Sequence, residues 1–209
     1  TFDLDIDGQG GTDRIVWGTS SRLNTIAAAA ETIDFDDNVL TVGNQTWDGD
    51  ILLDRNLNTR AEAGVIDFKG TIDGAYSLSV IRDGAGPVTT ILRDAVGATT
   101  PLTSLGSSRA SWQLEGGGVT TTGGQDYDGD ILLDAAGNAT VLESMGGANI
   151  DLGLATSSFI RSATDGEESL TLRTSGSTDI NARIGNIGRR RPPWTGRRGA
   201  WQRHRFEHV

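Results

Sequence analysis

Apolar and polar residues alternate along many short stretches of the chain. Ile66 and Phe68 flank a polar residue, and Leu170 and Leu172 flank Thr171 in the same way. Alternation with a period of two is typical of a β-strand that buries one face. We therefore expect a set of apolar residues to point into a core: Ile51, Leu53, Ile66, Phe68, Leu78, Val80, Ile131, Leu133, Leu170 and Leu172. The two Ile-Leu-Leu runs leave the direction of Leu52 and Leu132 open, because either parity fits them.

Turn signals separate these stretches. Asp-Gly pairs occur at 48–49, 73–74, 83–84, 128–129 and 165–166, and glycines cluster at 116–118 and 146–147. Asp-Gly favours tight turns, because glycine adopts positive φ and aspartate can bond its own backbone. Each of these positions is therefore predicted to be a turn. Only residues 26–33, with four alanines, have a helical character, and four alanines do not offset the cost of helix nucleation.

A long repeat organises the strands. The run DGDILLD occurs at 48–54 and again at 128–134, each time after an aromatic residue. Further matches follow, 66–68 with 150–152 and 73–80 with 165–172, so the offset grows from 80 to 84 and then 92. Loops of a repeat array vary in length while its stacking unit persists. We divide the chain into a weakly matching segment (1–31), a first unit (32–111), a second unit (112–188) and a tail (189–209).

Two all-β architectures fit this pattern: a β-solenoid and a string of β-sandwich modules. Each strand offers only two or three large apolar side chains, and the chain has five Trp, two Tyr and five Phe in 209 residues. Threonine and glycine abound, as in stacked sheets whose small side chains form ladders. These features favour the β-solenoid.

The segments GNQTWDGDILLD, IDFKGTIDGAYSLSV and VTTTGGQDYDGDILLD resemble the repetitive passenger regions of bacterial surface proteins, the filamentous-haemagglutinin-like and autotransporter-like adhesins. The resemblance covers residues 32–188. It implies a right-handed parallel β-helix that is secreted or held at the cell surface, associated with the outer membrane through parts of a parent protein outside this sequence. It implies structural display and adhesion to a host-surface or matrix ligand such as a carbohydrate, with neighbouring repeats as further partners. It supplies no functional residue.

The composition of the chain limits the kinds of functional site that it can form. The net charge is −10, there is no cysteine, and both histidines lie at 204 and beyond. Disulfides and thiolate metal sites are therefore excluded, and no histidine base stands before the tail. An acidic body repels nucleic acid, and no apolar run is long enough to span a membrane. We expect neither catalysis nor a cofactor, and we assign no catalytic, cofactor-binding or metal-ligating residue.

Two groups of carboxylates raise the question of calcium binding. Residues 3–8 read D-x-D-x-D-G, but Arg14 stands where an EF-hand needs glutamate, so we expect an edge strand with Phe2, Leu4 and Ile6 inward. The repeated Asp48, Asp50 and Asp54, with Asp128, Asp130 and Asp134, are expected to be turn residues on a solvated rim. Besides a structural or adhesive repeat, two functions stay open: a carbohydrate-active β-helix enzyme (a polysaccharide lyase or hydrolase) and a calcium-dependent binding module.

The tail breaks the pattern. Residues 189–209 hold seven arginines and one acid, a charge of +6, whereas residues 1–188 carry −16. Basic residues interleaved with Trp194 and Trp201 are typical of an arm for nucleic acid or anionic surfaces. The favoured hypothesis is a disordered product of a frameshift, because arginines begin where the repeat requires small residues.

Overall fold

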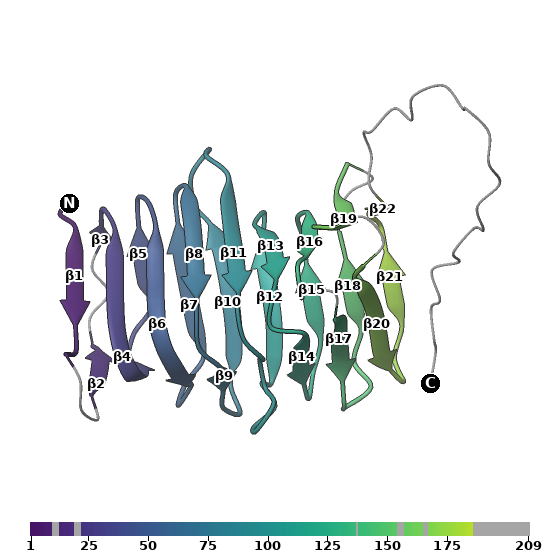
Figure 1. Ribbon diagram of the computed structural model, residues 1–209, viewed down its shortest axis with the longest axis horizontal. Coiled ribbons are helices and arrows are strands. Elements are labelled where there is room, and N and C mark those ends of the chain that lie inside the picture. The colour runs from purple at the N-terminus through teal and green to yellow at the C-terminus, as the bar shows by residue number, and fades with distance from the viewer. Residues whose placement is uncertain (10–12, 19–21, 137, 154–156, 165–166, 186–209) are drawn as a thin grey trace.

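The chain folds entirely as stacked parallel strands. A computed structural model describes residues 1–9, 13–18, 22–136, 138–153, 157–164 and 167–185, and these contain 22 strands and no helix. The strands follow one another along the long axis of the molecule (Figure 1). All strand pairs among the described residues are parallel, for example β11 (Val88–Leu92) with β8 (Gly64–Phe68). The predicted β-solenoid is therefore confirmed, and the alternative of β-sandwiches, which are built from antiparallel sheets, is wrong. The described residues include no helix that could cross a membrane.

Each coil of the solenoid has three faces. The first face consists of β1 (Leu4–Asp7), the first halves of β4 (Ile26–Phe35) and β6 (Gln45–Leu52), β8, β11, β13 (Ser111–Leu114), β16 (Ile131–Leu133), β19 (Phe159–Ser162) and β22 (Arg183–Ile184). The second face consists of β2 (Arg14–Trp17), the second halves of β4 and β6, β9 (Ile72–Asp73), β14 (Gly118–Thr121), β17 (Ala139–Ser144) and β20 (Ser169–Thr174).

The third face is an eight-stranded sheet. It consists of β3 (Arg22–Leu23), β5 (Val39–Thr41), β7 (Leu57–Ala61), β10 (Ser77–Arg82), β12 (Ser104–Ser108), β15 (Gln125–Tyr127), β18 (Ile150–Leu152) and β21 (Thr178–Ile180). The chain visits the faces in the order first, second, third, and the described part makes about eight turns. The coils differ in length. Near one end of the stack the register pairs Ile26 with Gln45, whereas near the other end it pairs Ile131 with Ile160, which is further away in the sequence.

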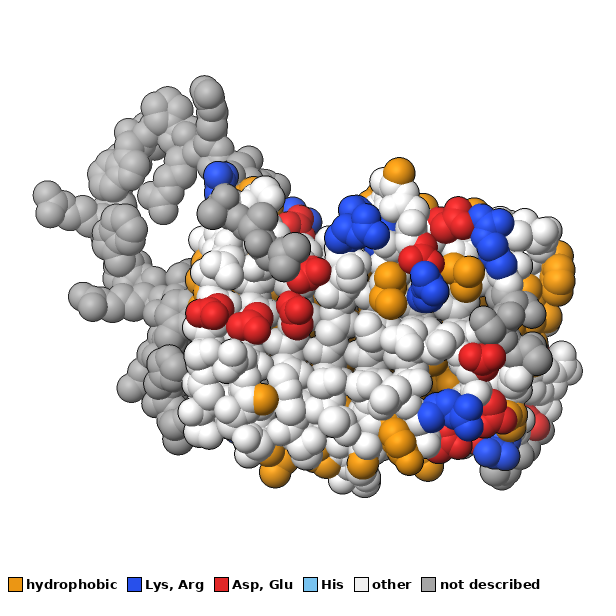
Figure 2. All heavy atoms as spheres, turned by 180° about the vertical axis from the view of Figure 1, so that it is seen from behind, with side chains coloured by type: hydrophobic (Ala, Val, Ile, Leu, Met, Phe, Trp, Pro, Cys, Tyr) orange, Lys and Arg blue, Asp and Glu red, His pale blue; other side chains and the backbone are white. Residues whose placement is uncertain are grey.

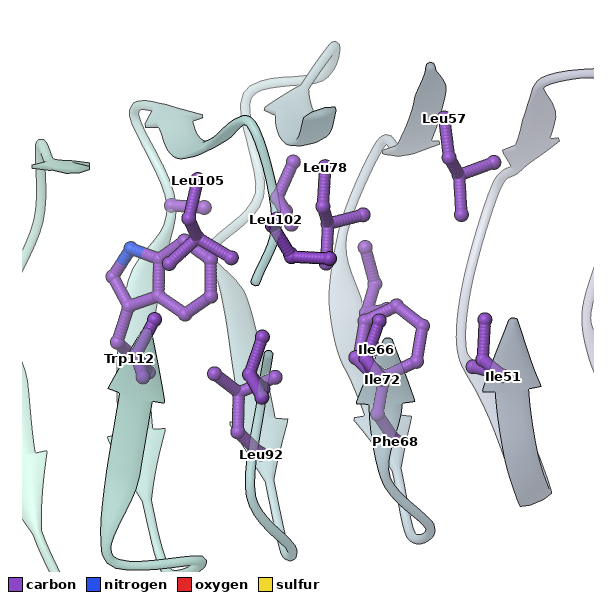
Figure 3. Close-up of a cluster of buried hydrophobic side chains, with 14 of the residues drawn as sticks. Ile51, Leu57, Ile66, Phe68, Ile72, Leu78, Leu92, Leu102, Leu105 and Trp112 are labelled. Carbon is purple, nitrogen blue, oxygen red and sulfur yellow. The ribbon is translucent and has the colours of Figure 1, made fainter. Parts of the chain in front are cut away.

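The core is a continuous column of inward side chains contributed by all three faces (Figure 3). Nine of the ten residues that the alternation assigns to the core are buried, and the tenth, Leu170, is half-buried and packs against the column. Leu52 is 54% exposed while Ile51 and Leu53 are buried, which fixes the parity of the Ile-Leu-Leu run. Aromatic residues pack edge to face in the column at two levels, where Trp47 meets Phe35 and Trp112 meets Tyr127.

The two repeat units lie in one stack, but the second is rotated by one face. The first copy begins at Gln45 on the first face, and the second begins at Gln125 on the third face. The following matched strands keep the same displacement: β8 is on the first face and β18 on the third, and β10 is on the third face and β20 on the second. The two copies are therefore not a whole number of coils apart, and the unit that repeats is a strand with its corner. The division into the four segments stays a prediction, and the coils run without a break through its boundary at 111–112, inside β13.

Both copies build the same corner despite this rotation. The Gln45 side-chain amide donates to the Thr41 hydroxyl at 3.2 Å and to the Arg60 carbonyl at 2.8 Å. The Gln125 amide donates to the Thr121 hydroxyl at 3.2 Å and to the Glu143 carbonyl at 2.9 Å. Both glutamines are fully buried. Repetition in the sequence therefore specifies local corner geometry, and loop lengths decide which face receives it.

Several local predictions are corrected. Residues 26–33 form part of strand β4 and not a helix, and their side chains alternate between core and surface. The Asp48–Gly49 pair lies inside β6 where that strand bends between two faces. The pairs at 83–84 and 128–129 lie at bends, as predicted, and at 73–74 the bend begins at Gly74, directly after Asp73 ends β9. Phe2 precedes β1 and is 64% exposed, so its inward orientation is wrong, while β1 is the edge strand that the sequence predicts. The pair at 165–166 and the tail 189–209 lie outside the described residues.

Candidate functional site

Three aspartates form a row on the outside of the third face. Asp126, Asp151 and Asp179 are the middle residues of β15, β18 and β21, and the strand register pairs Asp126 with Asp151 and Asp151 with Asp179. Inward neighbours such as Tyr127 and Leu152 hold these short strands in the core and so direct the aspartates outward. Adjacent strands are about 4.8 Å apart, so the carboxylates are stacked at close range. We call Asp126, Asp151 and Asp179 the acidic row.

A shallow hollow of about 340 Å³ lies beside the acidic row. Its floor is formed by small outward residues of β10 and β12, including Ser79, Ser104 and Gly106, and its rim includes Asp126 and Asp151. A Cβ atom added at Gly106 would meet nothing nearer than 3.9 Å, which shows how open this position is. Figure 2 shows acidic side chains in a row near the C-terminal end of one face, beside a broad area of uncharged side chains. The hollow is lined by no aromatic residue.

The row carries uncompensated negative charge. Partial burial, with repulsion from Asp128 and Asp151, raises the pKa of Asp126 to about 6. Partial burial and the charge of Asp179 raise the pKa of Asp151. One carboxylate oxygen of Asp128 and one of Asp151 are shielded from solvent without a hydrogen-bond partner. Within the described part of the chain no arginine or lysine forms an ion pair with the row. The arrangement attracts cations and repels anionic ligands.

The aspartates singled out by the repeat do not gather in one place. Asp50 accepts a hydrogen bond from the Thr71 amide at 2.9 Å, and its counterpart Asp130 accepts one from the Phe159 amide at 3.0 Å. In both copies this residue therefore ties one coil to the next. Its structural role explains its repetition better than metal binding does.

The remaining members of these two sets have separate partners. Asp48 pairs with Lys69 at 2.6 Å, and Asp54 lies 3.5 Å from Arg55. The Asp134 carboxylate accepts a hydrogen bond from Gln113, and Asp128 accepts one from the Arg109 amide. The described residues contain no group of three or more acids or histidines arranged to hold a metal ion.

Near the N-terminus, Asp3 accepts hydrogen bonds from the Asn24 amide and the Thr25 hydroxyl, each at 2.7 Å. These bonds, led by the one from Thr25, lower the pKa of Asp3. Asp5 and Asp7 are exposed on β1. The D-x-D-x-D-G run thus forms an edge strand whose first acid ties it to the next coil.

Sequence reasoning missed the acidic row. Its members share a signal, because each is the middle residue of a short strand: Gln125-Asp126-Tyr127, Ile150-Asp151-Leu152 and Thr178-Asp179-Ile180. The stretch of chain from Asp126 to Asp151 differs in length from the stretch between Asp151 and Asp179, and neither length matches the repeat offset. Only knowledge of coil lengths could have aligned them.

Comparison of the chain with protein families, with curated proteins and with solved structures gave no match.

Proposed function

We propose that the chain is a shaft segment, a stack of coils that holds distal parts of a secreted or cell-surface bacterial protein away from the cell, and that it is not catalytic. The observation that carries this proposal is the unbroken column: each of about eight coils is joined to the next by parallel ladders and a shared apolar core. Such an array resists bending, because deformation must break many backbone bonds together.

Side chains reinforce the connection between coils. The Asn44 and Asp50 side chains each accept a hydrogen bond from a backbone amide of the next coil, at Val65 and Thr71. Arg93 contacts Asp67 at 2.7 Å and Glu115 at 2.8 Å, bridging three successive coils. Exposed ion pairs contribute little to stability individually, so the backbone ladders and the shared apolar core are the main mechanical elements.

The adhesive role, the surface location and the partners rest on the resemblance of residues 32–188 to adhesin passenger repeats. Neighbouring repeats of a parent chain would continue such a shaft. The shaft would hold out a region that binds a ligand on the host surface or in the matrix, such as a carbohydrate. Nucleic acid is not among the proposed partners, because an acidic surface repels its phosphates.

Single-molecule pulling of the full chain tests the shaft. We expect resistance with stepwise extension, each step releasing about one coil, because each coil contacts only its neighbours. Asp50→Ala combined with Asp130→Ala should lower the unfolding force, since both residues bond the next coil. Asp5→Ala combined with Asp7→Ala, which changes exposed acids of β1, is the matched control. Extension without measurable resistance would contradict the proposal.

The hollow beside Asp126 and Asp151 makes the enzyme alternative testable. It contains carboxylates but lacks the aromatic lining on which a sugar ring stacks. We expect no turnover of acidic or neutral polysaccharides by the full chain. Saturable release of reducing ends that is lost in Asp126→Asn would overturn the non-catalytic proposal. A rise in melting temperature with millimolar calcium, reversed by a chelator, would instead support a calcium-dependent module.

A further inference from the structure

We propose that copies of this chain stack end to end, the first coil of one copy lying on the last strands of another, rotated by one face. The first described coil consists of β1, β2 and β3, and the last strands of the three faces are β20, β21 and β22 (Figure 1). Each of these six strands pairs with a single strand of the described part. An unpaired strand edge is a template for another strand. The proposal is independent of the shaft function, because it concerns the two ends of the stack and not its rigidity.

Backbone bonds between coils have a constant direction. Amides of inward strand residues donate to the next coil, as the Leu4 amide does to the Thr25 carbonyl at 3.1 Å. Amides of outward strand residues donate to the preceding coil, as the Thr120 amide does to the Val96 carbonyl at 2.8 Å. Two stacks of the same polarity can therefore continue one ladder.

The two ends present the halves of such a ladder. On β20 the forward-facing amides are those of the inward Leu170 and Leu172, and on β1 the backward-facing amides are those of the outward Asp5 and Asp7. The described part holds no strand beyond either edge. A second copy in the same orientation brings each set opposite the carbonyl groups that it needs.

The spiral path of the chain fixes the rotation between the copies. The described strands begin with β1 on the first face and end with β22 on that same face. Without rotation, β1 would lie on β22 and leave a gap of one strand spacing, about 4.8 Å, above β20 and β21. Rotation by one face closes this gap, because it places β1 on β20, β2 on β21 and β3 on β22. The two-residue strands β3 and β22 then meet each other.

Core side chains at both ends lack the cover that a neighbouring coil gives elsewhere. Ile184 on β22 is 48% exposed, whereas its register partner Ile160 on β19 is 3% exposed. Of the six apolar residues that pack against the core while only partly buried, five belong to the first coil or the last strands: Leu4, Ile15, Leu170, Ile180 and Ala182. Stacking would remove their apolar surface from water, which favours association.

Matching inward residues also brings opposite charges together. With inward residues on inward residues, Leu4 of one copy lies on Leu170 of the other. Three residues further along each strand, Asp7 then lies beside Arg173. The half-exposed Arg173 side chain is 3.7 Å from Glu143 of its own copy, and its five N–H donors leave some for Asp7.

One pair of like charges meets where β3 lies on β22, namely Arg22 and Arg183. Each already has a contact in its own copy, because Arg22 pairs with Glu62 and the Arg183 guanidinium lies 5.7 Å from the centre of the Phe159 ring. Exposed charges of this kind contribute little, so the ladder and the apolar contact decide the association.

Sedimentation of the full chain over a range of concentrations tests the stacking. A head-to-tail contact that does not close on itself builds open filaments. We therefore expect species of increasing length that do not stop at a dimer, and rods of constant width in electron micrographs.

A proline at the open edge should block the contact. Asp5→Pro removes a backward-facing amide and leaves the bonds between β1 and β4 intact, as proline is tolerated on an outer strand edge. We expect this variant to stay monomeric, with the circular dichroism spectrum and melting temperature of the parent. Asp5→Asn, which keeps the amide, is the matched control and should associate.

A charge swap tests the register. Arg173→Asp and Asp7→Arg should each raise the concentration needed for association by about tenfold, because each brings like charges together. The double variant should restore association. Arg55→Asp makes the same change of charge away from both ends and should have no effect.

Four outcomes would overturn the proposal. A chain that is monomeric at every concentration has no such contact. Association that stops at a dimer would show a closed contact instead of a head-to-tail one. Filaments that persist in Asp5→Pro would show that the edge of β1 is not used. A double variant no better than either single variant would show that Asp7 and Arg173 do not meet, and that the copies are not related by a rotation of one face.

Discussion

Two glycines of the repeated run are required by the approach of a neighbouring coil. A Cβ atom at Gly49 would lie 1.8 Å from the Ala30 carbonyl oxygen, and one at Gly129 would lie 2.3 Å from the Ala110 carbonyl oxygen. At both corners the backbone of the preceding coil fills the space that a side chain would need. The sequence pattern marked these glycines as turn formers, but close packing between coils is the stronger reason for them.

Gly49→Ala and Gly129→Ala should each lower the free energy of unfolding by about 1–3 kcal/mol, the usual cost of overpacking. Chemical denaturation measures this. Gly18→Ala is the control, because a Cβ atom there would meet nothing within 4 Å, and it should change stability by less than about 0.5 kcal/mol. Equal effects at Gly18 and Gly49 would contradict the packing argument.

The buried glutamines offer a second test at this scale. Gln125→Ala removes donors to Thr121 and Glu143 and leaves the Tyr127 hydroxyl, which donates to Gln125 at 2.9 Å, without its acceptor. Unsatisfied buried polar groups cost about 1–3 kcal/mol, and we expect at least that loss of stability in urea unfolding. Gln113→Ala, on the outer side of β13, should cost much less. A similar loss in both variants would show that the corner network contributes little.

At the scale of elements, strand identity followed from local alternation but strand placement did not. Ile66 and Phe68 could be assigned inward from the sequence alone, because a strand's two faces follow its period of two. The rotation of the second copy and the acidic row depend on how much chain each coil takes, and that length varies along the stack. The segments between strands set the length of each coil, and these segments carry no periodic signal in the sequence. Sequence reasoning therefore found the strands and missed the site that their stacking creates.

Partial burial of Asp126, with repulsion from Asp128 and Asp151, makes stability depend on pH. The folded state raises the pKa of Asp126 to about 6, above the value of about 3.9 for an unperturbed aspartate. The folded state therefore binds this proton more tightly than the unfolded state. The destabilisation is fully present above pH 6 and is relieved as the pH falls from 6 toward 4.

Asp126→Asn removes this titration, so it should stabilise the protein more at pH 7.5 than at pH 5. The measurement is the difference in unfolding free energy between variant and parent at each pH, which cancels other groups such as Asp3, whose pKa is lowered. Asp7→Asn, at an exposed acid of β1, is the control. A variant-minus-parent difference that is the same at both pH values would show that Asp126 does not titrate in this range.

For the whole molecule, stability is a sum over neighbouring coils. Each coil contacts only the coils before and after it, so a defect in one coil should weaken its neighbours first. Phe68 is fully buried on β8, between β6 and β11. Truncating it creates a cavity near the middle of the stack, at a cost of about 3–5 kcal/mol.

Phe68→Ala should therefore reduce hydrogen-exchange protection most in β6, β8 and β11 and much less in β15 and β18. Exchange measured by mass spectrometry on peptides from each coil resolves this gradient. Phe159→Ala, at a half-buried residue on β19, is the control and should lower protection near β16 and β22 without affecting β6. Equal loss along the entire stack would mean that the solenoid unfolds as a single cooperative unit, and a shaft built from it would then fail all at once instead of coil by coil.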